Sequence, residues 1–152
     1  MKNYYINKNT LAIIPYGENK SLIYEGDKRI IVDRRPNSII KFNCLIYGSS
    51  IDGRLLSCKR IAGYRYKTPI LIKEDERILF FPTSSPRLKS CSWISLENIN
   101  NYYFDNVEKH CVINFNNNVS LDLDISYGVF NNQVLRSTRY LSILDKILTS
   151  NR

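Results

Sequence analysis

Short apolar runs alternate with turn residues along most of the chain, a pattern typical of β-strands. A glycine-containing turn at residues 25–28 separates two of these runs and predicts a β-hairpin. The acidic stretch 74–76 and the proline- and serine-rich stretch 82–86 separate further runs. On this basis we expect strands at residues 4–6, 10–14, 21–24, 29–33, 69–73, 77–81, 92–96, 99–104, 110–115 and 119–125.

Two segments in the middle of the chain are bounded by residues that commonly start and end helices. Pro36 and Ser38 precede an apolar segment that ends at Gly48, which predicts a short helix over residues 38–47. The Ser49-Ser50 pair supplies an N-cap for a second short helix at about residues 52–61. Strand is the competing interpretation of both segments, because β-branched residues are frequent there.

Apolar residues at helical spacing predict a long C-terminal helix, with Ser126 as its N-cap. The apolar stripe consists of Tyr127, Phe130, Val134, Leu141, Leu144 and Leu148. We expect it to pack on the domain's own sheet, and a subunit interface is the alternative. Arg136 and Arg139 fall off the stripe, so we expect them to face solvent or a ligand.

These elements predict an α+β fold in one domain over residues 1–152, with a mostly antiparallel sheet, one or two short central helices and a long C-terminal helix. With 43% hydrophobic and 24% charged residues, the composition argues against disorder. No apolar run approaches the ~20 residues that span a bilayer, and the N-terminus does not read as a secretory signal. We therefore expect a cytoplasmic protein, without a membrane partner, whose four cysteines are reduced.

Positive charge is concentrated in the middle of the chain. Residues 28–90 hold fourteen basic and five acidic residues, whereas the segments on either side are close to neutral, and the whole chain carries +8. An excess of this kind is typical of a surface that binds a polyanion. The simpler interpretation is a solvated face that keeps the protein soluble.

Enzymatic motifs are scarce. His110 is the single histidine, and Asp122 and Asp124 alternate with apolar residues as the outer face of a strand would. The chain has no phosphate-binding P-loop, dinucleotide fingerprint, nucleophile elbow or metal motif. We therefore expect neither an enzyme nor a cofactor.

The stretch 48–54 fits a phosphate-contacting turn instead. Small residues let backbone N–H groups approach an anion, Ser49 and Ser50 offer hydroxyls, and Arg54 offers a bidentate guanidinium. Lys59, Arg60, Arg65 and Lys67 follow, with tyrosines interleaved at positions 64 and 66. This fits a nucleic-acid surface, although an edge strand protected by lysines has the same composition.

Five blocks of this sequence, in order, resemble the competence transcription factor (ComK) family of Gram-positive bacteria. They are Gly48-Ser49-Ser50 with Gly53-Arg54; Lys67-Thr68-Pro69-Ile70; Phe80-Phe81-Pro82-Thr83-Ser84-Ser85; Cys91-Ser92-Trp93-Ile94-Ser95; and Ile125-Ser126-Tyr127 with Asn132-Gln133-Val134 and Arg136. The blocks run from about residue 10 to residue 141. One departure is Ser57-Cys58, where members of the family often show Gly-Thr.

The resemblance implies a DNA-binding activator of DNA-uptake genes that binds paired AT-rich boxes, largely from the minor groove, and self-associates on the promoter. It also implies a location with the nucleoid and contact with the transcription machinery. A narrow AT-rich minor groove attracts inserted Arg and Lys, in agreement with the basic middle segment. The alternative function is an RNA-binding or protein-interaction module without promoter activity.

The residues expected to contact DNA fall into two groups. The first group is Ser49, Ser50, Arg54, Lys59, Arg60, Arg65 and Lys67. The second group is Arg34, Arg35, Lys41, Arg87 and Lys89. Trp93 and the Phe80-Phe81 pair lie in apolar strand contexts, so we expect them to pack in the core.

Overall fold

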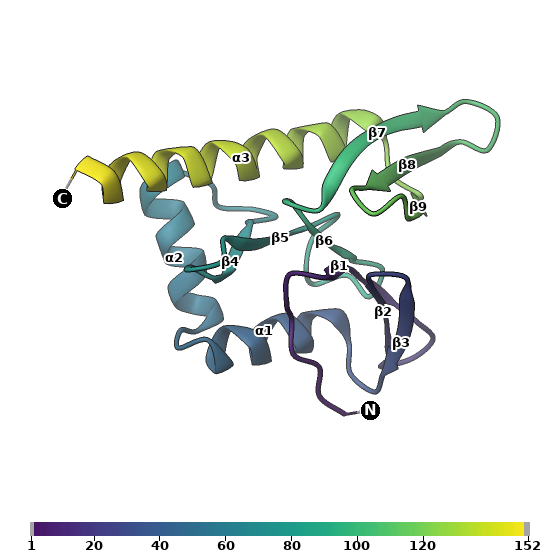
Figure 1. The fold of residues 1–152 in the computed structure, drawn as a ribbon, viewed down its shortest axis with the longest axis horizontal. Coiled ribbons are helices and arrows are strands. Elements are labelled where there is room, and N and C mark those ends of the chain that lie inside the picture. The colour runs from purple at the N-terminus through teal and green to yellow at the C-terminus, as the bar shows by residue number, and fades with distance from the viewer. Residues whose placement is uncertain (1, 151–152) are drawn as a thin grey trace.

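The computed structural model describes residues 2–150, which form nine strands in two sheets and three helices (Figure 1). The larger sheet has the order β3-β2-β1-β6-β5-β4 and the smaller one the order β7-β8-β9, and all the strand pairs described are antiparallel. The strands are β1 Thr10–Pro15, β2 Ser21–Glu25, β3 Lys28–Val32, β4 Ile70–Lys73, β5 Ile78–Pro82, β6 Trp93–Ser95, β7 Ile99–Asp105, β8 His110–Phe115 and β9 Ser120–Leu123. The predicted α+β class and the predicted hairpin are confirmed.

The helices are α1 (Pro36–Ile46), α2 (Ile51–Ala62) and α3 (Tyr127–Ser150), so helix is confirmed over strand for both central segments. Pro36 lies in the first turn of α1, where a missing N–H costs nothing. Ser50 Oγ accepts the Gly53 N–H at 3.0 Å and caps α2, which ends at Gly63 with φ +80°. Ser126 Oγ accepts the Val129 N–H at 3.2 Å and starts α3, as predicted.

Strands β4, β5 and β6 of the larger sheet are buried on both faces, which explains their continuous apolar sequences, whereas the edge strand β3 is largely exposed. Ile70 and Ile72 point into a core shared with α1, whereas Leu71, between them, points into a core shared with α2 and α3. A third core joins β1, β5 and β6 to the smaller sheet and to Phe130 of α3. Figure 1 accordingly shows α1 and α3 on opposite sides of the molecule.

The strand expected at residues 4–6 does not form. The backbone of this segment bonds to a side chain instead: the Ile6 N–H donates to Asn43 Oδ1 at 2.8 Å, and Asn43 Nδ2 donates to Tyr4 O at 2.9 Å. The apolar side chains of Tyr4 and Ile6 are nevertheless buried. The apolar pattern therefore identified Tyr4 and Ile6 as core residues correctly, but it wrongly predicted that a neighbouring strand would bond to their backbone.

The apolar stripe of α3 is only partly the buried face. The fully buried positions are Phe130, Gln133, Ser137 and Tyr140, whereas Tyr127 and Leu148 are exposed. A seven-residue repeat drifts by about 20° per heptad on a straight helix, so its ends leave the packed face. Figure 1 shows the C-terminal end of α3 extending past the sheet. None of the helices described in residues 2–150 combines the length and apolar character that crossing a bilayer requires.

Candidate nucleic-acid interface

A cavity of about 550 Å³ opens between α1, the first half of α2 and the loop that joins β5 to β6. Four of the cations expected to contact DNA line it: Arg35, Lys41, Arg87 and Lys89. They come from two distant segments of the chain, and only the fold brings them together. Among the described residues that line the cavity, Asp52 is the one carboxylate. We call these four residues the cavity cations.

The N-terminus of α1 adds to the positive potential of the cavity. Arg35 is its N-cap residue and its side chain accepts no hydrogen bond from the N–H groups of the first turn, which holds no acidic residue. The helix dipole places partial positive charge at this end, which favours an anion. The floor of the cavity is apolar, with Ile40, Ile70 and Trp93 among its residues.

The loop that carries Arg87 and Lys89 is tied to this helix end. Asn37 Nδ2 donates to Pro86 O, and Trp93 Nε1 donates to Asn37 Oδ1 at 2.9 Å. At the base of the loop, the Thr83 N–H donates to Ser92 O at 2.9 Å. Trp93 is buried, as its apolar context predicted, and its ring N–H also holds Asn37 against the loop.

A second group of cations lies at the end of α2 and in the segment that follows. Lys59, Arg60 and Arg65 are exposed, and Lys67 is half-buried. Leu55 of α2 lines the cavity. Lys59 follows it by four residues and therefore lies on the same face of the helix. Thr68, directly after Lys67, also lines the cavity. Lys59 and Lys67 of this second group therefore lie next to residues that line the cavity.

The segment of residues 64–67, here the 64–67 loop, is held by α3. Gln133 Nε2 donates to Lys67 O at 2.9 Å, and Arg136 Nη2 donates to Tyr66 O at 2.6 Å. Arg139 Nη1 donates to Ala62 O at 3.0 Å. Both arginines of α3 therefore bind backbone carbonyls; Arg139 is also exposed to solvent, as expected, whereas Arg136 is half-buried.

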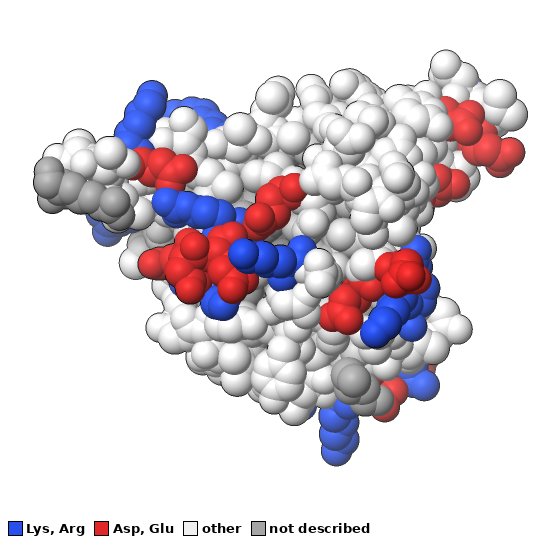
Figure 2. Space-filling view, viewed as in Figure 1, with Lys and Arg blue, Asp and Glu red and all other residues white. Residues whose placement is uncertain are grey.

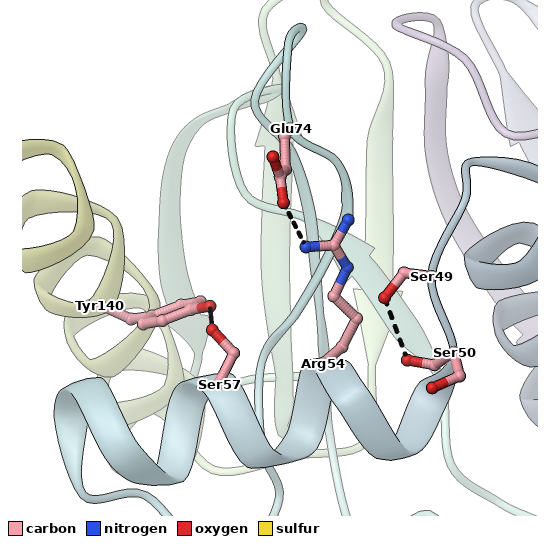
Figure 3. Close-up of polar contacts among 6 residues, drawn as sticks. All are labelled: Ser49, Ser50, Arg54, Ser57, Glu74 and Tyr140. Carbon is pink, nitrogen blue, oxygen red and sulfur yellow. Dashed lines mark hydrogen bonds and ion pairs between the residues drawn. The ribbon is translucent and has the colours of Figure 1, made fainter. Parts of the chain in front are cut away.

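Arg54 occupies a different place from the one expected. Figure 3 shows its side chain rising from α2 toward the turn between β4 and β5, where Nη1 lies 2.8 Å from Glu74 Oε1. The Arg54 side chain is only 10% exposed. Ser50 is used as the cap of α2, and Ser49 Oγ lies 3.5 Å from Ser50 O. Ser50 and Arg54 therefore have intramolecular partners, whereas Ser49 makes only this long contact.

Arg34 is also directed elsewhere, since its Nε donates to Lys2 O at 2.8 Å. Other cations of the middle segment are paired with carboxylates, for example Lys73 with Glu76 at 2.9 Å and Arg77 with Asp145. Figure 2 shows blue and red side chains side by side on the face that it displays. The net charge of the segment therefore overstates the cations free to meet a polyanion.

The cysteine thiols, the candidate nucleophiles and metal ligands of the chain, are shielded from solvent. All four cysteines are buried, and burial raises the pKa of the Cys44 and Cys58 thiols to about 11. A thiol with so high a pKa is protonated at neutral pH and is a poor nucleophile or metal ligand. In residues 2–150 no three His, Cys, Asp or Glu side chains form a group able to hold a metal ion.

Comparison with known proteins agrees with the order of motifs. The family model described as ComK protein matches residues 1–148. The chain belongs to the ComK family. A competence transcription factor from Bacillus subtilis (strain 168) is 32% identical over 143 residues, which cover 90% of this chain and 72% of that relative. No solved structure matches this ComK-family chain.

Proposed function

We propose that this chain is a DNA-binding transcription activator of competence genes that recognises paired AT-rich boxes largely through the minor groove. The observation that carries the proposal is the cavity, which four cations from two distant segments line beside the positive end of α1. The name of the related competence transcription factor points to the same class of function. The protein would act with the nucleoid, in the cytoplasm.

The cavity cations would contact the phosphate backbone. Arg35, Arg87 and Lys89 form its rim beside an uncapped helix start, a combination suited to one or two adjacent phosphates. Lys41 and Lys59 extend the positive surface along α1 and α2. Contacts of this kind fix the register on DNA and leave base reading to another element.

The 64–67 loop would reach the minor groove. Arg65 is exposed and Lys67 projects from the same loop, and a narrow AT-rich groove has the negative potential that attracts such side chains. Arg60 lies on the exposed surface of α2 near the loop. Ser49, Ser50, Arg54 and Arg34 would support the fold around this surface rather than contact DNA.

Self-association on DNA and contact with the transcription machinery belong to the same proposal. Paired boxes require at least two binding units at a fixed spacing, which a symmetric assembly of copies supplies.

The structure favours duplex over single-stranded RNA. Single-strand readers present several aromatic rings as stacking platforms. The Tyr64 ring is covered by the Arg136 guanidinium at 4.4 Å, so Tyr66 is the one interleaved tyrosine of the basic run with an open ring. One open ring between cations does not form such a platform.

A mobility-shift series with AT-rich duplex, GC-rich duplex and single-stranded DNA tests the proposal. We expect the AT-rich duplex to bind at least about tenfold more tightly than the others, since minor-groove readout separates A·T from G·C. If about six phosphates are neutralised, log K should fall with log salt at a slope near −5. Preference for the single strand, or an affinity independent of salt, would contradict the proposal.

A further inference from the structure

The 64–67 loop is an exposed segment that three hydrogen bonds from α3 hold in place. Lys67 O accepts two donors, Gln133 Nε2 at 2.9 Å and Arg136 Nη1 at 3.3 Å, and Tyr66 O accepts Arg136 Nη2 at 2.6 Å. Gln133 is buried, and its Nε2 also donates to Pro82 O at 2.7 Å. The guanidinium of Arg136 therefore grips two successive carbonyls, while Gln133 ties the loop to β5.

The two tyrosines of the loop have different surroundings. Tyr64 lies against α3, with the guanidinium groups of Arg136 and Arg139 at 4.4 Å and 5.7 Å from its ring. Tyr66 is 78% exposed. Lys67, which follows Tyr66 in the chain, has φ +48°. A non-glycine residue keeps this left-handed conformation when its surroundings enforce it. The bracing by α3 supplies that enforcement.

The same carbonyl contacts orient the rest of the backbone. In a trans peptide the N–H points opposite to the C=O. Because the carbonyls of Tyr66 and Lys67 point at α3, the next N–H groups, those of Lys67 and Thr68, point away from it. The loop thus presents the exposed side chains of Arg65 and Tyr66 next to backbone N–H groups that point away from α3 and suit an anion.

We propose that Tyr66 is a wedge that inserts against a base step in the minor groove, with Gln133 and Arg136 as the positioning residues that hold the loop ready. This inference rests on the proposed function. Side chains that enter the minor groove partly unstack a base step, and A·T-rich TA steps unstack most easily. A loop already held in one conformation loses little entropy on insertion. Arg65 and Lys67 would hold the phosphates and base edges on either side of the wedge.

The test uses the full chain and an AT-rich duplex in which 2-aminopurine replaces one adenine at a time. Unstacking of the probe base raises its fluorescence, so the wild-type protein should produce a rise at one TA step. Tyr66→Ala should remove that rise and lower the affinity about 10-fold to 100-fold, since a base–aromatic stack is lost. The slope of log K against log salt should stay unchanged, because no phosphate contact is removed.

Three variants serve as controls. Tyr66→Phe keeps the ring and should retain both the fluorescence rise and the affinity. Tyr103→Ala removes another exposed tyrosine, from β7 of the smaller sheet, and should behave as the wild type. Arg136→Lys keeps the charge but cannot fork between two carbonyls, so it should weaken the fluorescence rise without changing the salt slope.

The outcomes separate the wedge from the proposed function. If the wild type binds AT-rich duplex and Tyr66→Ala retains wild-type affinity and fluorescence, the wedge is wrong and the proposed function stands. If Tyr66→Phe loses as much as Tyr66→Ala, the hydroxyl rather than the ring is used, and the wedge is again wrong. If the wild type binds no duplex, the proposed function fails and the wedge fails with it.

Discussion

Replacing Arg87 and Lys89 together by alanine is expected to lower the affinity for AT-rich duplex by about 100-fold near physiological salt, since two phosphate contacts are lost. Both side chains are exposed at the rim of the cavity, beside the uncapped start of α1. The slope of log K against log salt should become shallower by about 2. The melting temperature should stay within about 2 °C, because neither side chain is buried.

The matched control removes the same charge elsewhere. Lys28 and Lys146 are exposed on β3 and α3 and do not line the cavity. Lys28→Ala with Lys146→Ala should lower the affinity far less than the cavity pair, through the change in net charge alone. Equal losses in the two double variants would show that binding responds to net charge and not to the cavity.

Arg54→Ala is expected to destabilise the fold by about 2 kcal/mol, because a buried cation that bonds a carboxylate and packs along α2 is lost. That corresponds to a fall of about 6 °C in melting temperature. Well below this temperature, the affinity for DNA should remain close to that of the wild type. Thermal denaturation followed by circular dichroism, with binding measured on the same samples, gives both quantities.

Lys59→Ala, one turn further along the same helix, should show the opposite behaviour. Its side chain is exposed, so the melting temperature should hold while the affinity for DNA falls about fivefold, the effect of one phosphate contact. If Arg54→Ala keeps the stability of the wild type but loses DNA binding, Arg54 contacts DNA and its structural role is wrong.

Local signals account for most of what the sequence predicted correctly. Proline, serine and glycine at the ends of α1 and α2 outweighed the β-branched residues within them, and capping by Ser50 and Ser126 acts within three residues. Short apolar runs bounded by turn residues located the strands of both sheets. The strand predicted at residues 4–6 was wrong because the backbone of this segment bonds to the Asn43 side chain. Asn43 lies about forty residues away, and no local sequence pattern can indicate such a partner.

The candidate site likewise divides into features that the local sequence predicted and contacts that depend on the folded chain. Composition identified the basic segment, but it could not tell which cations have carboxylate partners. Arg54 meets Glu74 and Arg77 meets Asp145 only once the β4–β5 turn has packed against α2 and α3. Gln133 was noted only as part of a family-like block, and Arg136 was expected to face solvent or a ligand. Polar residues on the inner face of an apolar helix were the signal of a buried hydrogen-bonding role.

Amide hydrogen exchange of the full chain, with and without AT-rich duplex, tests the central claim most directly, because it maps the DNA-binding face without substitution. We predict that DNA slows exchange at the start of α1, in the 64–67 loop with Thr68, and in the loop carrying Arg87 and Lys89. Exchange in β7 and β8 of the smaller sheet should not change. Protection confined to β7 and β8, with none around the cavity, would contradict the account.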